Sequence, residues 1–400
     1  MIGAHGGVAT TVAVGLAALR QNLIGPAGLV TAAPRFSGLP LIGWEDLILG
    51  GHEIRRSSSE QAARQLAQSS RAFDTSLVDA CREDLSRLDL EVRPGVLRHV
   101  GNTITELSDP SFSRAQGTAR EIVSILQNDL DEFVARNELQ QVVVVNLAST
   151  EPPVAPTAIP TNWTELEKTL DTKNCALPSS SLYAIAALER GHPFVNFTPS
   201  IGSDLPAIDE LAKSKNTCHI GRDGKTGETF LKSVLAPAFA ARNLEIMSWV
   251  GHNIFGNMDG QVLNDPANKA TKVTSKDKLL GEILGYPPQT HISIEYIRSL
   301  GDWKTAWDHI HFRGFLGTPM IMQFTWQGCD SVLAAPLVLD LVRLVDLASR
   351  RGGNGTLDFL ASFFKSPQGT NIHEFSKQFD MLLGWVDRQI ELSDRKPAKG

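Results

Sequence analysis

A run of four valines at residues 142–145 constrains the fold more than any other stretch of this chain. Unbroken β-branched residues are typical of a strand that is buried on both faces in a parallel sheet. Further strand-like and helical patterns alternate around this run: strand-like at residues 193–196 and 217–220, helical at residues 12–20, 119–137, 181–190 and 205–214. This alternation predicts an α/β fold in which a Rossmann-like, doubly wound parallel sheet is covered by helices.

Length and composition indicate an ordinary globular protein. The chain has 400 residues, 42% hydrophobic and 20% charged, enough for one large or two moderate domains. The formal net charge of −6 offers no basic field for nucleic acid or for an anionic membrane. An anionic substrate would therefore need a local cluster of lysines. With no signal peptide and no apolar run near 18 residues, we expect a soluble protein that is not exported.

Cysteine and histidine usage gives little indication of a metal. The four cysteines are widely spaced and form neither a CxxC pair nor a zinc-ligand pattern, so we expect free, mostly buried thiols in a reducing cytoplasm. His309 and His311 could share one strand face and bind a metal. No carboxylate motif accompanies them, so structural histidines are favoured and no metal is predicted.

A glycine-rich turn at the amino terminus predicts a nucleotide site. Its glycines would let the backbone approach a pyrophosphate, and the N-terminus of the following helix would bind it. The candidate cofactor-binding residues are Gly3, Gly6, Gly7, Thr10 and Thr11. His5 and Val8 stand where the dinucleotide fingerprint has its second and third glycines, so a purely structural turn remains open. The two residues before Gly3 are also too few for an ordinary strand, so either that strand is short or the native start lies upstream.

Three further residues are candidate cofactor ligands because they follow predicted strands. Glu53 follows a strand expected at residues 45–51, and an acid there could accept hydrogen bonds from ribose hydroxyls. A solvated loop carboxylate is the alternative. Asn146 and Ser149 follow the valine run, at the edge where parallel sheets bind ligands.

The later part of the chain has a different pattern. Residues 57–92 are expected to be a covering helical insertion, and residues 252–260 a polar loop. Strands are predicted at residues 292–297 and 319–326 with a broken helix at 303–310 between them, followed by a long helix at 331–349. We therefore predict a second, mixed α+β domain at residues 230–327.

The loop at residues 221–229 is a candidate phosphate site. It is not a P-loop, because His219 occupies the position of the first required glycine. Backbone N–H groups, hydroxyls and one ammonium group could still converge there, from Lys225, Thr226, Gly227, Glu228 and Thr229. A helix cap formed by Thr226 or Thr229 without a ligand is the alternative. Glu228 would repel a phosphate unless it were turned away or offset by Lys232.

Lys272 and Lys276, four residues apart, would repel each other on one helix face, which favours an anion between them. These lysines, the loop at 221–229 and residues 253–260 resemble the signature of the myo-inositol-1-phosphate synthase family, in one register over most of the chain. The resemblance identifies Lys272, Lys276, Lys304 and Lys365 as active-site lysines, accompanied by Asn253, Asp259 and Asp223. It also places Asp330 against the nicotinamide amide, whereas helix capping is the alternative for Asp330.

The resemblance implies cyclisation of D-glucose 6-phosphate to 1D-myo-inositol 3-phosphate with NAD⁺, through oxidation at C5, loss of a proton from C6, aldol closure onto C1 and reduction. Lys272 and Lys304 would handle the proton and the oxyanion at C5, while Lys276 and Lys365 would stabilise the C1 oxygen and the phosphate. The resemblance also implies that residues 1–229 and 328–400 together form the NAD-binding domain, and that a homotetramer assembles through the inserted domain at residues 230–327. Two alternatives stay open: a relative acting on another sugar phosphate, and a catalytically silent NAD-binding or assembly protein.

Overall fold

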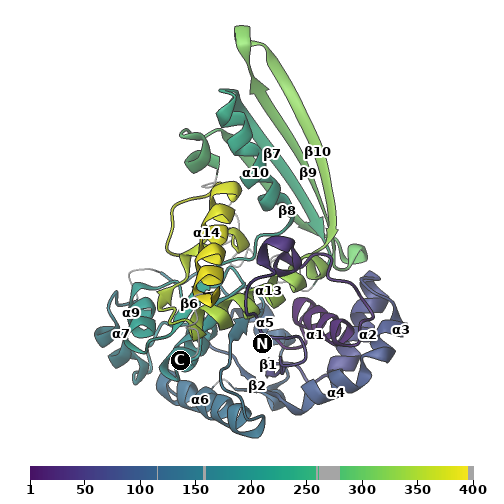
Figure 1. Ribbon diagram of the computed structural model, residues 1–400. Helices are drawn as coiled ribbons and strands as arrows, with labels where there is room; N and C mark the ends of the chain where they lie inside the picture. The colour runs from purple at the N-terminus through teal and green to yellow at the C-terminus, as the bar shows by residue number, and fades with distance from the viewer. Residues whose placement is uncertain (115, 156–158, 258–259, 261–279, 395–400) are drawn as a thin grey trace.

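Two sheets organise the molecule (Figure 1). The computed structural model describes residues 1–114, 116–155, 159–257, 260 and 280–394. One sheet is parallel and is covered by helices, and the other is a four-stranded sheet whose long strands project away from the first (Figure 1). The α/β architecture expected from the sequence is therefore confirmed.

The parallel sheet has a single residue at its centre. Ile2 forms parallel bridges to His52 on one side and to Asn146 on the other. One flank has the strand order β4 (Val144–Asn146), β5 (Phe194–Asn196), β6 (Cys218–Gly221) and β11 (Gly355–Thr356); the other has β1 (Gly51–Glu53), β2 (Val92–Val96) and β3 (Ser113–Arg114). Ile2 thus occupies the place of the strand before the glycine turn.

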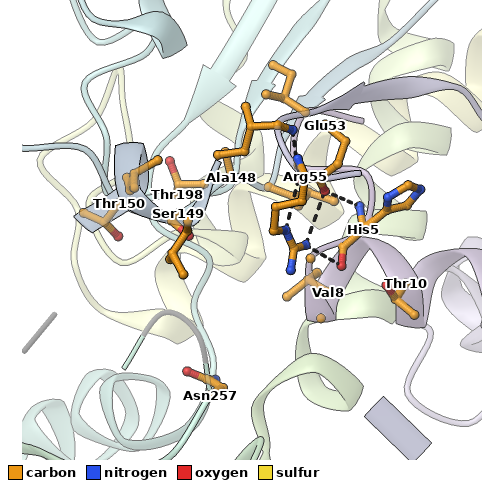
Figure 2. A pocket seen from close by; sticks show the side chains of 18 of the residues that line it. His5, Val8, Thr10, Glu53, Arg55, Ala148, Ser149, Thr150, Thr198 and Asn257 are labelled. Atoms are coloured by element: carbon orange, nitrogen blue, oxygen red, sulfur yellow. Dashed lines mark hydrogen bonds and ion pairs between the residues drawn. The ribbon is translucent and has the colours of Figure 1, made fainter. Parts of the chain in front are cut away.

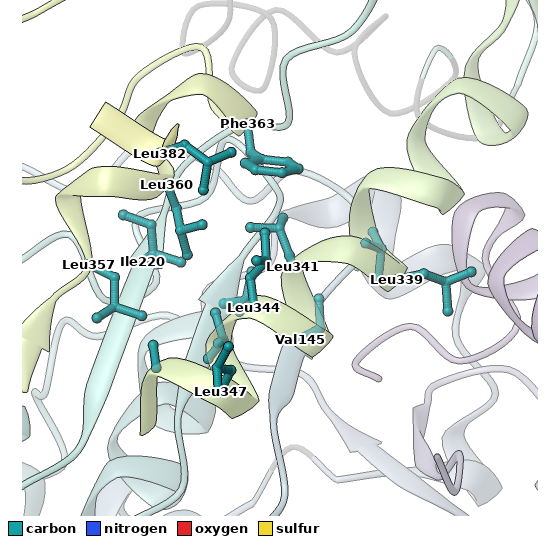
Figure 3. Close-up of a cluster of buried hydrophobic side chains, with 14 of the residues drawn as sticks. Val145, Ile220, Leu339, Leu341, Leu344, Leu347, Leu357, Leu360, Phe363 and Leu382 are labelled. Carbon is teal, nitrogen blue, oxygen red and sulfur yellow. The ribbon is translucent and has the colours of Figure 1, made fainter. Parts of the chain in front are cut away.

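Helices pack on both faces of this sheet, as a doubly wound fold requires. Val145 belongs to the core cluster formed with α1 (Gly7–Arg20), α13 (Asp330–Arg350) and α14 (Phe375–Asp394), part of which is drawn in Figure 3. Its neighbour Val144 packs into the opposite cluster, which draws on α6 (Ala119–Arg136), α7 (Trp163–Leu170), α8 (Ser179–Glu189) and α9 (Pro206–Ser214). Successive valines point to opposite faces, and both faces are buried, as the valine run predicted.

The helical insertion forms as predicted. It consists of α2 (Ser59–Ser70), α3 (Thr75–Ala80) and α4 (Arg82–Leu90), followed after β2 by α5 (Asn102–Leu107). Ser58 and Gln61 form a capping box at the start of α2, in which each side chain accepts a hydrogen bond from the other's backbone N–H. The buried Val78, Leu85 and Leu88 join the apolar face of α1 in one core cluster.

The second sheet has the order β10 (Pro319–Cys329), β9 (Trp303–Arg313), β7 (Glu245–Phe255) and β8 (Gln289–Tyr296). The helix α10 (Gly227–Ala241) packs against its inner face, where Phe239 joins Trp249 and Ile310 in a core cluster. The division of the chain at residues 230 and 328 stays a prediction.

Three sequence expectations were wrong. Residues 303–310 are not helical but form most of β9, in which Trp303 and Trp307 are exposed while Ala306, Asp308 and Ile310 are buried. This two-residue alternation is that of a strand with one covered face. Residues 252–255, expected in a loop, continue β7, and only Gly51 of the strand expected at residues 45–51 belongs to β1.

Two chemical expectations can be compared with the described residues. All four cysteines are free and buried, as predicted: Cys81, Cys175, Cys218 and Cys329. In the described part of the chain, no helix is both long and apolar enough to span a membrane, and no group of three or more His, Cys, Asp or Glu side chains is arranged to hold a metal ion.

Candidate active site

A cleft of about 1260 Å³ opens at the carboxyl ends of the parallel strands, where ligands bind in folds of this type. Its walls come from the glycine turn, the segments after β1, β4 and β5, the loop before α10 and the start of α13. Residues of the second sheet complete it, among them Gly256, Asn257 and Asp302. Figure 2 shows part of this lining, with Asn257 lying apart from His5 and Val8 of the glycine turn.

The glycine turn has the geometry of a pyrophosphate cradle. Gly3 has a φ of +78°, and a Cβ added there would lie 3.0 Å from the Cα of Ala148, so a side chain would be strained. Gly6 and Gly7 line the cleft at the N-terminus of α1, whose first turn carries no acidic residue and no side-chain cap. Its first N–H groups cannot pair within the helix and are available to an anion.

The two threonines of α1 differ in position. Thr10 lines the cleft, whereas the Thr11 hydroxyl donates to the carbonyl oxygen of Gly7 at 2.8 Å and does not line it. Thr11 therefore stabilises the first turn from within the helix.

Glu53 lies at the expected end of β1, but its carboxylate is bound by its own chain (Figure 2). Oε2 accepts from the backbone N–H of His5 at 2.8 Å, and Oε1 from those of Ile54 and Arg55 at 2.9 and 3.1 Å. The Arg55 guanidinium contacts both oxygens and also donates to the His5 carbonyl. Burial would raise the pKa of Glu53, but the Arg55 charge and these N–H donors hold that pKa below its ordinary value.

The strand end after β4 carries a buried polar network. The Asn146 amide donates to Asn196 and Thr198 at 3.1 Å each, which fixes the side chains of two neighbouring strand ends. Ser149 follows and lines the cleft (Figure 2). Glu151 accepts from both the backbone N–H and the hydroxyl of Ser180, so it caps α8. Burial raises the pKa of Glu151 to about 7, against the lowering effect of these bonds.

The candidate phosphate loop begins α10. Thr226 is the N-cap residue, lines the cleft and forms no side-chain capping bond, so the ligand-free cap considered from the sequence is not formed by it. Gly227 follows with a φ of +59°, and Thr229 is buried. Asp223, Gly224 and Thr226 bring this loop to the cleft; Gly227, Glu228 and Thr229 lie behind its lining.

The charge of Glu228, the acidic residue of this loop, is offset by Lys232, which is one of the two arrangements that the sequence analysis considered. Lys232, one turn further along α10, lies 2.5 Å from the Glu228 carboxylate, and both side chains are at most 2% exposed. Lys232 also lies 3.8 Å from Asp308 on β9, which accepts a hydrogen bond from the Trp249 indole at 2.6 Å. Glu228 is therefore paired with Lys232 inside the protein, and the more distant Asp308 shares the same ammonium.

Lys225 is not brought to the cleft. Its ammonium donates to Gln378 on α14 and lies 5.9 Å from the centre of the Phe375 ring. Burial lowers the pKa of Lys225 to about 7. Its side chain stabilises the contact between the loop and α14.

Lys365 and Asp223 form an ion pair in the cleft. The Lys365 ammonium donates to Asp223 at 2.8 Å, and both residues line the cleft. Asp223 has a positive φ of 62°, and its backbone carbonyl accepts from the Lys365 N–H. Two segments far apart in sequence thus meet at the cleft wall, where one provides a hydrogen-bond donor and the other an acceptor.

Asp302 is a site residue that the sequence analysis missed. Its carboxylate accepts from the Ser331 N–H at 2.7 Å and from the Asn257 amide at 3.0 Å, while its own N–H donates to Ser70 on α2. It therefore caps α13 and joins that helix to the second sheet and to the helical insertion. Asp330, the first residue of α13, lines the cleft beside it. The turn of Gly301 and Asp302 before the strand was the available signal.

The other predicted catalytic residues divide into two groups. Asn253 and Lys304 lie on the inner face of the second sheet, outside the cleft lining; Lys304 lies 5.4 Å from the centre of the Phe255 ring. The Asn253 amide is fully buried and has no hydrogen-bond partner among the described residues. Lys272, Lys276 and Asp259 lie outside the described residues.

The fold and cleft define a class of protein: a doubly wound dinucleotide-binding fold whose site is completed by an inserted sheet. A family model described as myo-inositol-1-phosphate synthase matches residues 1–386. Inositol-3-phosphate synthase 1 of Bacteroides thetaiotaomicron is 34% identical over 96% of this chain and 92% of its own length. The chain therefore belongs to the myo-inositol-1-phosphate synthase family, as the motifs predicted.

Two further comparisons agree with this assignment. A probable inositol 3-phosphate synthase isozyme 3 of Arabidopsis thaliana is 31% identical over 80% of this chain, which spans 63% of that relative's length. The crystal structure of an inositol-3-phosphate synthase from Caenorhabditis elegans has a TM-score of 0.87 and 22% identity, covering 100% of this chain and 88% of that one. That likeness shows the shared fold.

Proposed function

We propose that the protein cyclises D-glucose 6-phosphate to 1D-myo-inositol 3-phosphate with bound NAD⁺. The meeting of Lys365 and Asp223 with the glycine turn in one cleft is the observation that carries this proposal. The names of the curated relatives and the family model, which is also named for NAD binding, support it. When bound, the nicotinamide would take a hydride from the sugar and return it, so the net reaction is an isomerisation.

The residues present fit the cofactor. Gly3 lies against Ala148 too closely for a side chain, and the uncapped first turn of α1 faces the cleft. Gly7 would bind the pyrophosphate through its backbone N–H, whereas Gly6, whose N–H donates to the Gly3 carbonyl at 3.0 Å, would let the phosphate come close to the backbone. Asp330, at the start of α13, would bind the nicotinamide amide.

The phosphate of the substrate would bind at the start of α10. Thr226 supplies a hydroxyl and a helix N-terminus that faces the cleft. Because Lys232 balances Glu228, that carboxylate adds little repulsion to an incoming dianion. The Lys365 ammonium would add a positive charge that offsets the negative charge of the substrate oxygens.

Ammonium groups would control proton movement and oxyanions during the reaction. Lys365, held by Asp223, would stabilise oxygen charge at C1 or at the phosphate. Lys304, and the predicted Lys272 and Lys276, would act on the proton and the oxyanion at C5. Asn253 would orient them, since its buried amide has polar atoms left to pair.

The direct test is incubation of the purified protein with glucose 6-phosphate and NAD⁺, followed by separation of the phosphate esters. We expect an inositol phosphate without net accumulation of NADH. The variant Lys365→Met should form it at least about 100-fold more slowly, while Lys213→Met on α9, a lysine outside the cleft lining, should match the wild type. Absence of inositol phosphate from the wild type would refute the proposal.

A related reaction on another sugar phosphate is the second candidate. The position of Lys225 favours it, because this lysine of the phosphate loop points to α14 and leaves the loop with one cation fewer. The same assay with other hexose and pentose phosphates distinguishes the two: a different ester would be consumed with bound dinucleotide present.

Assembly and location are part of the proposal. We expect a homotetramer formed through the second sheet, whose outer face exposes Trp307 and Ile321, 44% and 61% exposed. Exposed large apolar side chains on a sheet face are typical of an interface. Four buried free thiols fit a reducing cytoplasm.

A further inference from the structure

A direct contact joins the helical insertion to the second sheet beside the cleft. The turn at residues 301–303, which leads into β9, lies on the carboxyl end of α2. The Asp302 N–H donates to the Ser70 hydroxyl at 2.9 Å, and the Trp303 indole N–H donates to the Ser70 carbonyl at 2.6 Å. Ser70 is the last residue of α2, so its carbonyl has no partner within the helix and is capped by the indole. We call residues 69–70 and 301–303 the clasp.

Gly301 gives the clasp its close fit. Its φ is +55°, and a Cβ added there would lie 2.7 Å from the Ser70 hydroxyl oxygen and 2.9 Å from the Ser69 carbonyl oxygen. A side chain at this position would therefore push the turn away from α2. Trp303 nevertheless remains 38% exposed, so the contact buries little surface. Such a contact can open locally while the cores of both sheets stay folded.

The clasp lies where a bound dinucleotide would pass. Ser69 and Ser70 line the cleft from α2, and Gly301 and Asp302 line it from the second sheet. The turn also lies close to the pyrophosphate cradle, since a Cβ added at Gly7 would be 3.9 Å from the Asp302 carboxylate. The two walls of the cleft are thus joined beside the start of α1. Trp303 itself does not belong to the lining.

We propose that the clasp opens to admit or release the dinucleotide, and that it limits both rates while contributing little to affinity. The inference rests on the proposed dinucleotide cleft and describes how its occupant exchanges. Loosening a contact between two parts of the protein raises the open fraction of the free and of the bound protein alike. Association and dissociation then accelerate by the same factor, and the dissociation constant, which is their ratio, stays unchanged.

A slow exchange suits the proposed reaction. The hydride taken from the sugar returns to it, so the dinucleotide need not leave between turnovers. A clasp that retains the cofactor therefore does not slow the chemistry, whereas an enzyme that releases an oxidised or reduced cofactor in each cycle would be limited by it.

Trp303→Phe tests the clasp away from the ligand, because it keeps an aromatic ring and removes the indole N–H. The full chain, freed of nucleotide, is mixed with NADH in a stopped-flow instrument, and nicotinamide fluorescence reports association. Excess NAD⁺ then displaces the NADH and reports dissociation. We expect both rate constants to rise about fivefold, the amount that one net hydrogen bond contributes to an opening equilibrium, while the dissociation constant changes less than about twofold.

A second variant and a matched control accompany this measurement. Gly301→Ala disturbs the clasp from its other residue and should also raise both rate constants, because its Cβ meets Ser69 and Ser70. Trp163→Phe removes the indole of a half-buried tryptophan at the start of α7, outside the lining, and should leave both rate constants unchanged. Urea midpoints measured in parallel establish that each variant is folded.

The outcomes separate the clasp from the proposed function. Unchanged rate constants in both folded variants would refute the clasp. Faster dissociation of NADH without faster association in Trp303→Phe would also refute it, because the substitution would then have weakened ligand contacts. In both cases NADH would still bind, and the synthase proposal would stand. If the wild type bound no NADH, the dinucleotide cleft itself would be wrong, and both proposals would fail.

Discussion

The buried ion pair beneath the phosphate loop predicts a large loss of stability in Lys232→Met. This substitution keeps the length and apolar stem of the side chain but leaves Glu228 and Asp308 without the ammonium that lies 2.5 and 3.8 Å from them. Removing one partner from a buried ion pair costs about 3–5 kcal/mol. With a denaturant slope of about 3 kcal/mol/M, the urea midpoint should fall by about 1 M or more.

Urea unfolding followed by tryptophan fluorescence is a direct assay, since Trp249 lies in the same cluster. The matched control is Lys213→Met, which removes a lysine from another i,i+4 ion pair, with Asp209, at the surface of α9. Its midpoint should stay close to that of the wild type. The double variant Glu228→Gln with Lys232→Met should recover part of the loss, because one of the two carboxylates has become neutral.

The reasoning would be refuted if Lys232→Met unfolded within about 1 kcal/mol of the wild type. That result would mean that the two carboxylates do not depend on the lysine for their charge balance. The interpretation of Glu228 as a neutralised residue in the phosphate loop would then have no basis.

Four further predictions follow from the site. Gly3→Ala places a side chain at a φ of +78° against Ala148, so nucleotide affinity measured by calorimetry should fall about tenfold or more, with a cost of roughly 1–3 kcal/mol in stability. Lys365→Met should lower turnover by about 100-fold or more while nucleotide affinity is retained, and an equal loss of both would contradict its assignment to the substrate. The pKa of Glu151 lies near 7 in the folded chain against an ordinary 4.5, so between these pH values the folded chain holds a proton that the unfolded chain has released. The free energy of unfolding therefore falls by up to roughly 3 kcal/mol as pH rises through this window. Urea midpoints measured from pH 5 to 8 should show this fall in the wild type but not in Glu151→Gln, whose side chain does not titrate. Trp307→Glu should dissociate the proposed tetramer in sedimentation experiments, and an unchanged mass would exclude this face as the interface.

The sequence predicted the parallel sheet well because its signals are local. Val144 and Val145 indicate a strand with two buried faces from their side chains alone, and helices such as α6 carry an unbroken apolar period. The strand β9 was misread because Trp303, Trp307 and Asp308 do not alternate cleanly in hydrophobicity. Their burial is set by α10 and by the neighbouring strands, which lie elsewhere in the sequence.

The candidate site was predictable as a set of motifs, whereas its internal pairing was not. Glycine spacing indicated the turn at Gly3, and the need for a cation near Glu228 indicated Lys232. The pairing of Lys365 with Asp223, and the joining role of Asp302, depend on residues that meet through the fold. The orientation of Lys225 toward Gln378 is equally non-local, so the loop sequence alone suggested the opposite direction.

The contact between Asp302 and Cys329 allows the Cys329 thiol to report whether the contact between the two sheets opens. Cys329 lies at the end of β10 with its sulfur 3.1 Å from the Asp302 carboxylate, and burial together with that charge raises the pKa of the thiol to about 12. A closed junction thus keeps Cys329 protonated and protected from alkylating reagents. In a variant in which Cys329 is the one remaining cysteine, the alkylation rate would measure how often the contact between the two sheets opens. A ligand that binds to both sheets would lower that rate.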